Sequence, residues 1–313
     1  MSIFPAIEPY AVDYLSVNSE HKIYLEQSGN PNGTPVLFLH GGPGAGTSPI
    51  YRSFFDPKKY RIILFDQRGS GRSTPYGSVS NNTSYDLIED IKSILDHLTI
   101  KKSILYGGSW GSTLALLFSQ KYPSYVQSLV LRGIFLCREE DIKWFYQSGA
   151  HQIFPDYWSD FIDLIPTKER TDILKAFHQR IHGDDVSLSN ALCKKWAIWE
   201  GKCSTLYPSA DVVGQFDQCS ISLAKIETHF FKNDCFIEEN QILKNIDVIK
   251  DIKCEIVHGR YDIVCPFKQA YDLHCRYPNS KLHIIDNAGH SLLEPGITKK
   301  VLEIFNNHDQ LIK

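Results

Sequence analysis

The sequence predicts an α/β fold in which helices cover both faces of a mostly parallel sheet. The first observation is that short apolar runs alternate with helical patterns along most of the chain. Strand, helix and strand in this order are typical of a doubly wound sheet. The second observation is that the alternation stops for about a hundred residues and then resumes. That interruption predicts a helical insertion.

The first two predicted strands form an antiparallel hairpin, because residues 10–17 and 22–27 alternate in polarity around a short polar turn. The later runs are apolar throughout, as expected for strands buried on both faces of a sheet. These runs are Val36–Leu39, Arg61–Phe65, Ser103–Tyr106, Leu129–Leu131, Cys254–Val257 and Leu282–Ile285.

Amphipathic helices are predicted between and after these strands. Between the second and third apolar runs, Leu87, Ile91, Ile94, Leu95 and Leu98 recur at helical spacing and give one apolar face. The last helical segment lies near residues 301–305. The crossover helix is therefore expected to pack that face on the sheet.

Residues 137–244 show little strand character and contain four of the five tryptophans, with apolar residues at helical spacing. We interpret this stretch as a helical cap domain inserted into a core domain made of residues 1–136 and 245–313. The tryptophans of the predicted cap are Trp144, Trp158, Trp196 and Trp199.

The composition excludes several classes of function. A hydrophobic content of 42% and a net charge of −3 give no electrostatic reason to bind nucleic acid or an anionic membrane. The N-terminus lacks a signal-peptide pattern, and no run of about 18 apolar residues occurs. The eight cysteines stand singly, which favours reduced thiols over disulfides or a zinc site. We therefore expect a cytoplasmic protein. The sequence predicts no oligomeric state.

The motif Gly107–Gly111 has the form Gly-x-Ser-x-Gly and follows a predicted buried strand. In such motifs the serine occupies a strained strand-to-helix turn, where a side chain two positions to either side would collide with backbone. The apolar helical pattern that follows, with Leu114, Leu117 and Phe118, supplies the expected helix. This context predicts Ser109 as a nucleophile and the α/β-hydrolase fold.

A serine nucleophile needs a histidine base and a carboxylate that orients it, in the chain order Ser, Asp or Glu, His. Asp262 follows the strand that ends at Val257, and His290 follows the strand that ends at Ile285. We predict Asp262 and His290 as these partners. Less well placed alternatives are His21, His258, His274, His308, Asp272 and Asp286.

The glycine-rich segment His40–Gly44 ends the first buried strand and is expected to form an oxyanion hole. Two backbone N–H groups usually stabilise the oxyanion, which assigns those of Gly42 and Trp110. A phosphate or dinucleotide loop is less consistent with the glycine spacing and with the absence of a Gly-Lys-Ser/Thr ending. His178 and His182 are four residues apart but lack an adjacent glutamate and an evident third ligand, so we expect no metal there. A serine hydrolase mechanism needs no organic cofactor either.

Four motifs together resemble the prolyl aminopeptidases, also called proline iminopeptidases. The combination that includes Trp110 is the specific part, and further similarity extends from Glu8–Tyr10 to Glu294–Gly296. The four motifs are His40–Gly44, Asp66–Ser73, Gly108–Leu114 and Leu131–Phe135.

The resemblance implies that two cap glutamates hold the free amine of the substrate, and Glu200 and Glu227 stand in the matching segments. A protonated secondary amine has two N–H bonds and one charge, which a pair of carboxylates satisfies. Each contact can contribute up to about 4 kcal/mol before desolvation is subtracted. The resemblance also implies that Phe135, Val264 and Cys265 line a proline pocket.

The sequence departs from the family pattern near that pocket, with Val264 and Cys265 in place of small and polar residues. Thr228 stands where asparagine is expected.

We therefore predict a serine aminopeptidase that releases N-terminal proline from short peptides through a prolyl-enzyme intermediate. The alternative within the same fold is an esterase or lactonase that acts on a neutral ester. A dehalogenase or epoxide hydrolase is disfavoured, because those enzymes need a carboxylate where Ser109 stands. A binding protein without catalysis is disfavoured by the complete set of catalytic groups.

Overall fold

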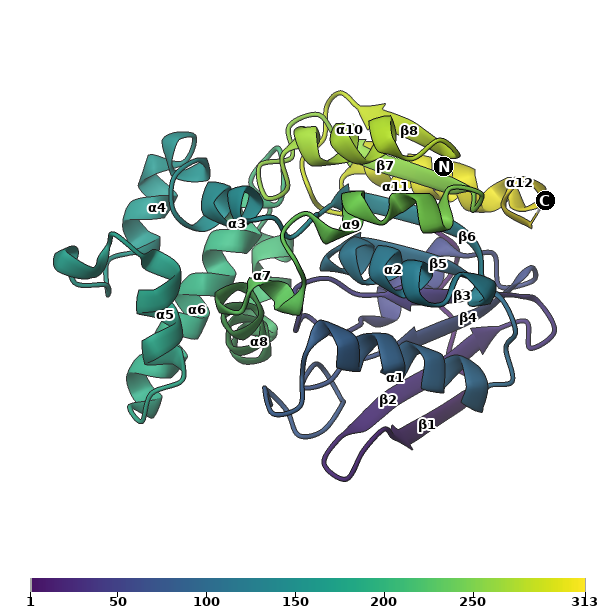
Figure 1. Ribbon diagram of the computed structural model, residues 1–313, viewed down its shortest axis with the longest axis horizontal. Helices are drawn as coiled ribbons and strands as arrows, with labels where there is room; N and C mark the ends of the chain where they lie inside the picture. Colours follow the sequence, from purple (N-terminus) through teal and green to yellow (C-terminus); the bar gives the residue numbers. More distant parts are fainter. Residues whose placement is uncertain (1, 313) are drawn as a thin grey trace.

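The computed structural model describes residues 2–312 and contains an eight-stranded sheet in the order β1-β2-β4-β3-β5-β6-β7-β8 (Figure 1). β1 and β2 pair antiparallel, as do β2 and β4, and the other neighbours are parallel. The strands are β1 Ala11–Ser16, β2 Lys22–Gly29, β3 Thr34–Leu39, β4 Tyr60–Phe65, β5 Ser103–Ser109, β6 Val126–Ile134, β7 Cys254–Gly259 and β8 Ser280–Ile285. The predicted hairpin and mostly parallel sheet are confirmed.

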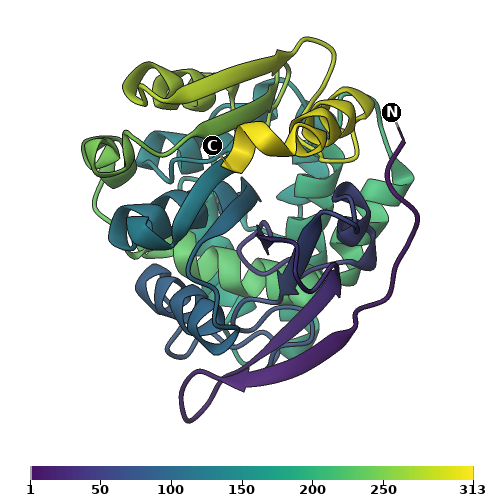
Figure 2. The ribbon, with the colours of Figure 1, turned by 90° about the vertical axis from the view of Figure 1, so that its right-hand side faces the viewer.

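The sheet is twisted, with the β1–β2 hairpin at one end and β8 at the other (Figure 2). Each predicted apolar run lies inside a strand. The central strand β5 is buried along its whole length. Burial on both faces explains why these strands carry continuous apolar runs and not an alternating pattern.

Helices cover both faces of this sheet. One apolar cluster combines α1 (Ser84–His97), α2 (Trp110–Lys121) and α10 (Phe267–Arg276) with one face. A second cluster combines α11 (Pro295–Asn306) and the 3₁₀ helix η1 (Pro49–Phe54) with the opposite face. The shorter helices are α9 Gln241–Lys244, α12 His308–Ile312, and the 3₁₀ helices η2 Pro123–Tyr125, η5 Asp234–Phe236 and η6 Ile246–Ile249.

Helix α1 illustrates how the sequence determines an element. Thr83 and Asp86 form a capping box, in which each side chain binds the other residue's backbone N–H. Leu87, Ile91 and Ile94 then bury one face of the helix against the core. The amphipathic crossover helix predicted from this spacing is confirmed.

Between residues 137 and 244 the regular structure is helical throughout, and these helices gather beside the sheet (Figure 1). They are α3 Glu139–Tyr146, α4 Pro155–Phe161, α5 Ile173–Ile181, α6 Val186–Cys203, α7 Ala210–Gln218 and α8 Ser220–Lys232, with the 3₁₀ helices η3 Ala150–Gln152 and η4 Thr167–Glu169. The short helices η5 and α9, given above, also fall between residues 137 and 244. Aromatic rings form their core, where Phe161 stacks on Phe177 and Trp199. The division into domains at these boundaries stays a prediction.

None of the helices within residues 2–312 has both the length and the apolar character needed to cross a bilayer.

An aromatic cluster attaches α11 to the sheet. The Tyr60 hydroxyl donates a 2.6 Å hydrogen bond to the Phe305 carbonyl at the end of the helix. Phe55 and Tyr106 contact the ring of Phe305 edge-on, at centroid distances of 4.7 and 5.5 Å. This contact matters for the site because α11 follows the loop that carries His290.

We expect Tyr60→Phe to lower the free energy of unfolding by about 1 to 2 kcal/mol, because a buried carbonyl loses its donor. Urea denaturation measures the change. Tyr207→Phe is the matched control: Tyr207 is 77% exposed, and we expect a change within about 0.5 kcal/mol. Equal stability of the two variants would contradict the role of this hydrogen bond.

Candidate active site

Ser109 ends β5 and precedes α2, with φ 57° and ψ −128°. This is an unfavourable conformation for a residue with a side chain. A Cβ atom added to Gly107 would lie 2.2 Å from the Gly111 carbonyl oxygen, and one added to Gly111 would lie 2.0 Å from the Leu39 carbonyl oxygen. The predicted need for glycine on both sides of the turn is confirmed.

Asp262 and His290 form a buried hydrogen-bonded pair, with 2.7 Å between His290 Nδ1 and Asp262 Oδ2. The second carboxylate oxygen accepts the Cys265 backbone N–H at 2.8 Å. Burial raises the pKa of Asp262, but His290, His258 and this N–H together hold it below its ordinary value. Asp262 is therefore ionised at neutral pH and can orient the imidazole.

Ser109 and His290 line the same cavity. In the described part of the chain the Ser109 hydroxyl makes no hydrogen bond to His290, and it lies beside the Cys265 thiol. Such contacts often tighten only when substrate is bound. Burial raises the pKa of Cys265, which keeps its thiol uncharged and suits a wall of the site.

The alternative acids and bases from the sequence lie in other surroundings. His258 is fully buried; its Nδ1 accepts the Ile134 N–H, and its Nε2 donates to the Cys265 carbonyl. Asp286 is exposed near Arg260, and Asp272 binds Arg138 and Lys268. His274 binds the Ser280 hydroxyl, and His21 binds the Ser80 carbonyl. The side chain of His308 lies outside the described residues.

His178 and His182 lie together, 4.5 Å apart by ring centroids, and His182 Nε2 contacts the Thr228 hydroxyl at 3.2 Å. Among residues 2–312, no group of three or more His, Cys, Asp or Glu side chains is placed to hold a metal ion. Thr228 also donates to the Ala224 carbonyl and lines neither cavity beside Ser109. This departure from the family pattern therefore does not alter the walls of the site.

Gly42 and Trp110 lie next to Ser109, and their role as oxyanion donors stays a prediction. Trp110 is the first residue of α2, so its N–H has no acceptor within the helix. Gly42 lines the cavities on both sides of Ser109. The Trp110 indole donates to Gln67 Oε1, and the Gln67 amide donates to the His40 carbonyl, each at 2.9 Å. These two hydrogen bonds connect the glycine-rich loop after β3 with the turn that carries Ser109.

Asp66 begins the motif Asp66–Ser73, to which no role was assigned from the sequence, and the structure shows that it holds the glycine-rich loop. Its carboxylate accepts the Thr47 N–H at 2.7 Å and the Arg72 N–H at 2.8 Å, and it pairs with the Arg72 guanidinium. Burial raises the pKa of Asp66, but Arg72, His40 and Thr47 hold it below the usual value. The ionised Asp66 fixes the loop that follows Gly42.

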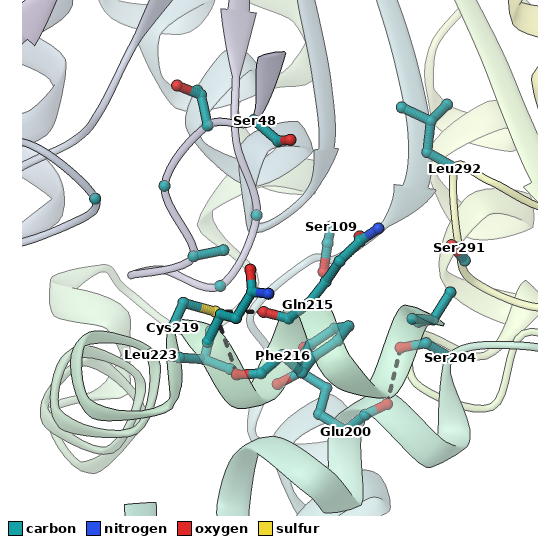
Figure 3. A pocket seen from close by; sticks show the side chains of 18 of the residues that line it. Ser48, Ser109, Glu200, Ser204, Gln215, Phe216, Cys219, Leu223, Ser291 and Leu292 are labelled. Carbon is teal, nitrogen blue, oxygen red and sulfur yellow. Dashed lines mark hydrogen bonds between the residues drawn. The ribbon is translucent and has the colours of Figure 1, made fainter. Parts of the chain in front are cut away.

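Two cavities meet at Ser109. The small one, of about 20 Å³, has an aromatic and apolar wall and three carboxyl groups, those of Asp141, Glu200 and Glu227. Asp141 is already paired with Arg138. The large one, of about 320 Å³, extends to the other side between the sheet and α7. Figure 3 shows Ser109 facing the helices that carry Glu200 and Phe216. Predicted residues that the structure places around the small cavity are Gly42, Ser109, Phe135, Glu200, Glu227, Val264 and Cys265.

Glu200 on α6 and Glu227 on α8 are buried next to each other. Glu227 Oε2 accepts the Trp196 indole N–H at 2.5 Å and the Tyr146 hydroxyl at 3.4 Å. Glu200 Oε2 is buried without a hydrogen-bond partner. Neither carboxyl group has a Lys, Arg or His nitrogen within 4 Å in the described residues, so the site lacks a cation.

The electrostatics of this pair follow from burial. Burial raises the pKa of Glu200 to about 7, and burial plus the neighbouring Glu200 charge raises the pKa of Glu227 well above its usual range. The hydrogen bond between the carboxyl groups lowers the pKa of Glu200 and raises that of Glu227. At neutral pH the pair therefore retains a proton on Glu227.

Sequence reasoning missed the groups that place His290. Gly133 has φ 49°, and a Cβ atom there would lie 2.8 Å from His290 Cε1. The Ser204 carbonyl, at the end of α6, accepts the N–H groups of His290 and Ser291 at 2.9 and 2.8 Å. Gly133 lies in the motif Leu131–Phe135, which was the available signal. The Ser204 contact has no sequence signature because it involves only backbone.

The α/β-hydrolase fold family matches residues 34–296, so this chain is an α/β hydrolase. A solved esterase from Exiguobacterium antarcticum has a TM-score of 0.65 and 22% identity, covering 93% of this chain and 96% of that one, which shows the fold alone. Proline iminopeptidases of Arabidopsis thaliana and Xylella fastidiosa (strain 9a5c) are 47% and 46% identical, over 96% and 94% of this chain and 80% and 95% of theirs. The chain belongs to the proline iminopeptidase family, which confirms the resemblance.

We expect Gly133→Ala to slow labelling of Ser109 by a fluorophosphonate about 100-fold, since the methyl group displaces His290 from its place beside the serine. Time-resolved labelling measures the rate, and circular dichroism checks the fold. Gly214→Ala is the control, because nothing lies within 4 Å of a Cβ atom there. Equal labelling rates in both variants would show that Gly133 does not position the base.

The Glu200 carboxyl group predicts a pH-dependent stability. Between pH 4.5 and about 7 the folded protein retains a proton that the unfolded chain has released, so this group lowers stability as pH rises. Above that pH range, the raised pKa of Glu200 lowers the free energy of unfolding by about 3 kcal/mol. Glu200→Gln should therefore match the wild type near pH 4.5 and gain stability relative to it up to pH 8, as measured by urea denaturation.

Glu303→Gln is the control of opposite sign, because Lys300 lowers the pKa of Glu303. The stability that Glu303 gives the wild type is lost as pH falls through the acid range, so the free energies of unfolding of Glu303→Gln and the wild type should converge there. A difference between Glu200→Gln and the wild type that stays constant with pH would contradict the raised pKa of Glu200.

Proposed function

We propose that this chain is a serine aminopeptidase that releases N-terminal proline from short peptides. The observation that carries the proposal is the pair Glu200 and Glu227, buried beside Ser109 without a cation. Burying carboxylates is costly unless a positive charge accompanies them. The protonated amine of an N-terminal residue supplies that charge and the N–H donors that Glu200 Oε2 lacks.

The small cavity supports proline as the residue that carries this amine. Phe135, Val264 and Cys265 give it an apolar wall, and Phe231 contacts Phe135 edge-on at 5.8 Å. A volume of about 20 Å³ holds about one water molecule, so a proline ring enters this cavity only when the side chains that line it move apart. The carboxyl groups lie in the same cavity, so ring and amine can be held together.

The proposed reaction begins when His290 takes the proton of Ser109 and the serine oxygen attacks the prolyl carbonyl. Asp262 holds the imidazole, and the N–H groups of Gly42 and Trp110 stabilise the oxyanion. His290 then protonates the departing peptide amine, which leaves a prolyl-enzyme ester on Ser109. Water activated by His290 hydrolyses that ester and releases proline.

The reaction as proposed needs no metal or organic cofactor. The cytoplasmic location expected from the sequence stays a prediction.

Three substrates test the proposal: proline p-nitroanilide, its N-acetyl derivative and a short-chain nitrophenyl ester. We expect fast hydrolysis of the free amide and little of the blocked one, because acetylation removes the positive charge. Cleavage of both amides at equal rates would contradict the role of the two glutamates. Hydrolysis of the ester alone would identify an esterase or lactonase instead.

Substitutions at the amine site give a second measurement. Glu200→Gln and Glu227→Gln should each lower kcat/KM for proline p-nitroanilide about 10- to 100-fold, which is the range for a charged hydrogen bond. Ser109 should still react with a fluorophosphonate. Glu139→Gln, at an exposed position of α3, is the matched control and should leave both rates unchanged.

A further inference from the structure

Arg132, near the end of β6, lines the large cavity together with Ser109 and His290. Its Nη1 donates to the His290 carbonyl at 3.1 Å. Its Nε is buried and has no hydrogen-bond partner. Within residues 2–312, no carboxylate oxygen lies within 4 Å of this guanidinium group.

Arg132 is partly buried, whereas three other arginines are buried and each is paired with a carboxylate. Arg52 pairs with Glu26, Arg68 with Asp90, and Arg138 with Asp141. A cation taken out of water without an anion is costly. Within the described residues Arg132 has only neutral neighbours, the Tyr106 hydroxyl and the His290 carbonyl, so its charge is free to pair with an anion that enters the cavity.

We propose that Arg132 binds the C-terminal carboxylate of a short prolyl substrate and makes the enzyme prefer dipeptides with a free carboxyl group. This inference rests on the proposed function. It adds a second ionic anchor at the opposite end of the substrate from the amine.

The geometry of the two cavities supports this orientation. With proline in the small cavity, the leaving residues extend from Ser109 into the large one. Its walls there are mainly neutral, with side chains such as Gln215, Ser222 and Ser291. Among residues 2–312, Arg132 and Glu200 are the only Asp, Glu, Lys or Arg side chains that line it, and Glu200 also faces the small cavity.

Chain length sets which carboxylate can reach Arg132. In a dipeptide the carboxylate belongs to the residue directly after the scissile bond, about 3.8 Å further along the chain. Arg132 is adjacent to the nucleophile turn, since its Nε would lie 2.4 Å from a Cβ atom placed on Gly108. Each added residue moves the carboxylate up to about 3.5 Å further away. The preference should therefore weaken in longer peptides.

The test compares kcat/KM for prolylglycine and prolylglycinamide, which differ only in the terminal charge. We expect the wild type to prefer the acid about tenfold, in line with one charged hydrogen bond. Arg132→Met, which keeps an apolar stem, should bring the ratio near one. Arg132→Lys should retain part of the preference, because a point charge remains.

Proline p-nitroanilide, which has no carboxylate, reports any loss that arises because Arg132 also holds the His290 carbonyl. Such a loss lowers all rates and leaves the acid-to-amide ratio unchanged. Lys194→Met removes a cation that is 58% exposed on the cap and should leave the wild-type ratio in place.

A wild-type ratio near one overturns the inference even if Arg132→Met does not fold, and so does a preference that survives in Arg132→Met. Cleavage of prolylglycine and prolylglycinamide at equal rates contradicts only the role of Arg132. Absence of hydrolysis for every prolyl substrate defeats the proposed function, and the inference with it.

Discussion

The backbone of Ser109 is the constraint on which the rest of the molecule depends. A positive φ at a residue with a side chain persists only where the surroundings determine it. Strand β3 provides that surrounding, because the Leu39 carbonyl occupies the space next to Gly111. The central strands of the parallel sheet therefore hold the turn at Ser109 in place. The loops after β3, β6, β7 and β8 converge on this turn.

Much of the fold could be predicted from the sequence because buried strands are apolar on both faces. Their ends could not. The run Leu129–Leu131 is the centre of β6, which extends from Val126 to Ile134. Ser128 and Arg132 interrupt the apolar pattern, yet they pair in the sheet because backbone hydrogen bonds do not depend on the side chain. Gly133 lies at an irregularity, where the register with β5 passes from Arg132 to Ile134.

For the site, chain order and strand ends were sufficient to bring Ser109, Asp262 and His290 to one edge of the sheet. Sequence could not show that Glu200 and Glu227 are buried without a cation, since the lack of a partner depends on every neighbouring element. For the same reason, the motif Leu131–Phe135 contains Arg132 but could not show that it lacks a carboxylate partner, because its surroundings come from β5, η1 and the loop after β8.

One turn of α6 connects the two ends of the proposed chemistry. The Ser204 hydroxyl donates to the Glu200 carbonyl, and the Ser204 carbonyl accepts the His290 N–H. The backbone of Glu200 and the backbone of His290 are thus held at a fixed spacing by the end of α6. Such a fixed separation favours substrates in which the amine and the scissile carbonyl are separated by the number of bonds found in an α-amino acid. A β-amino acid, with one methylene group more, would place its carbonyl carbon out of line with the nucleophile.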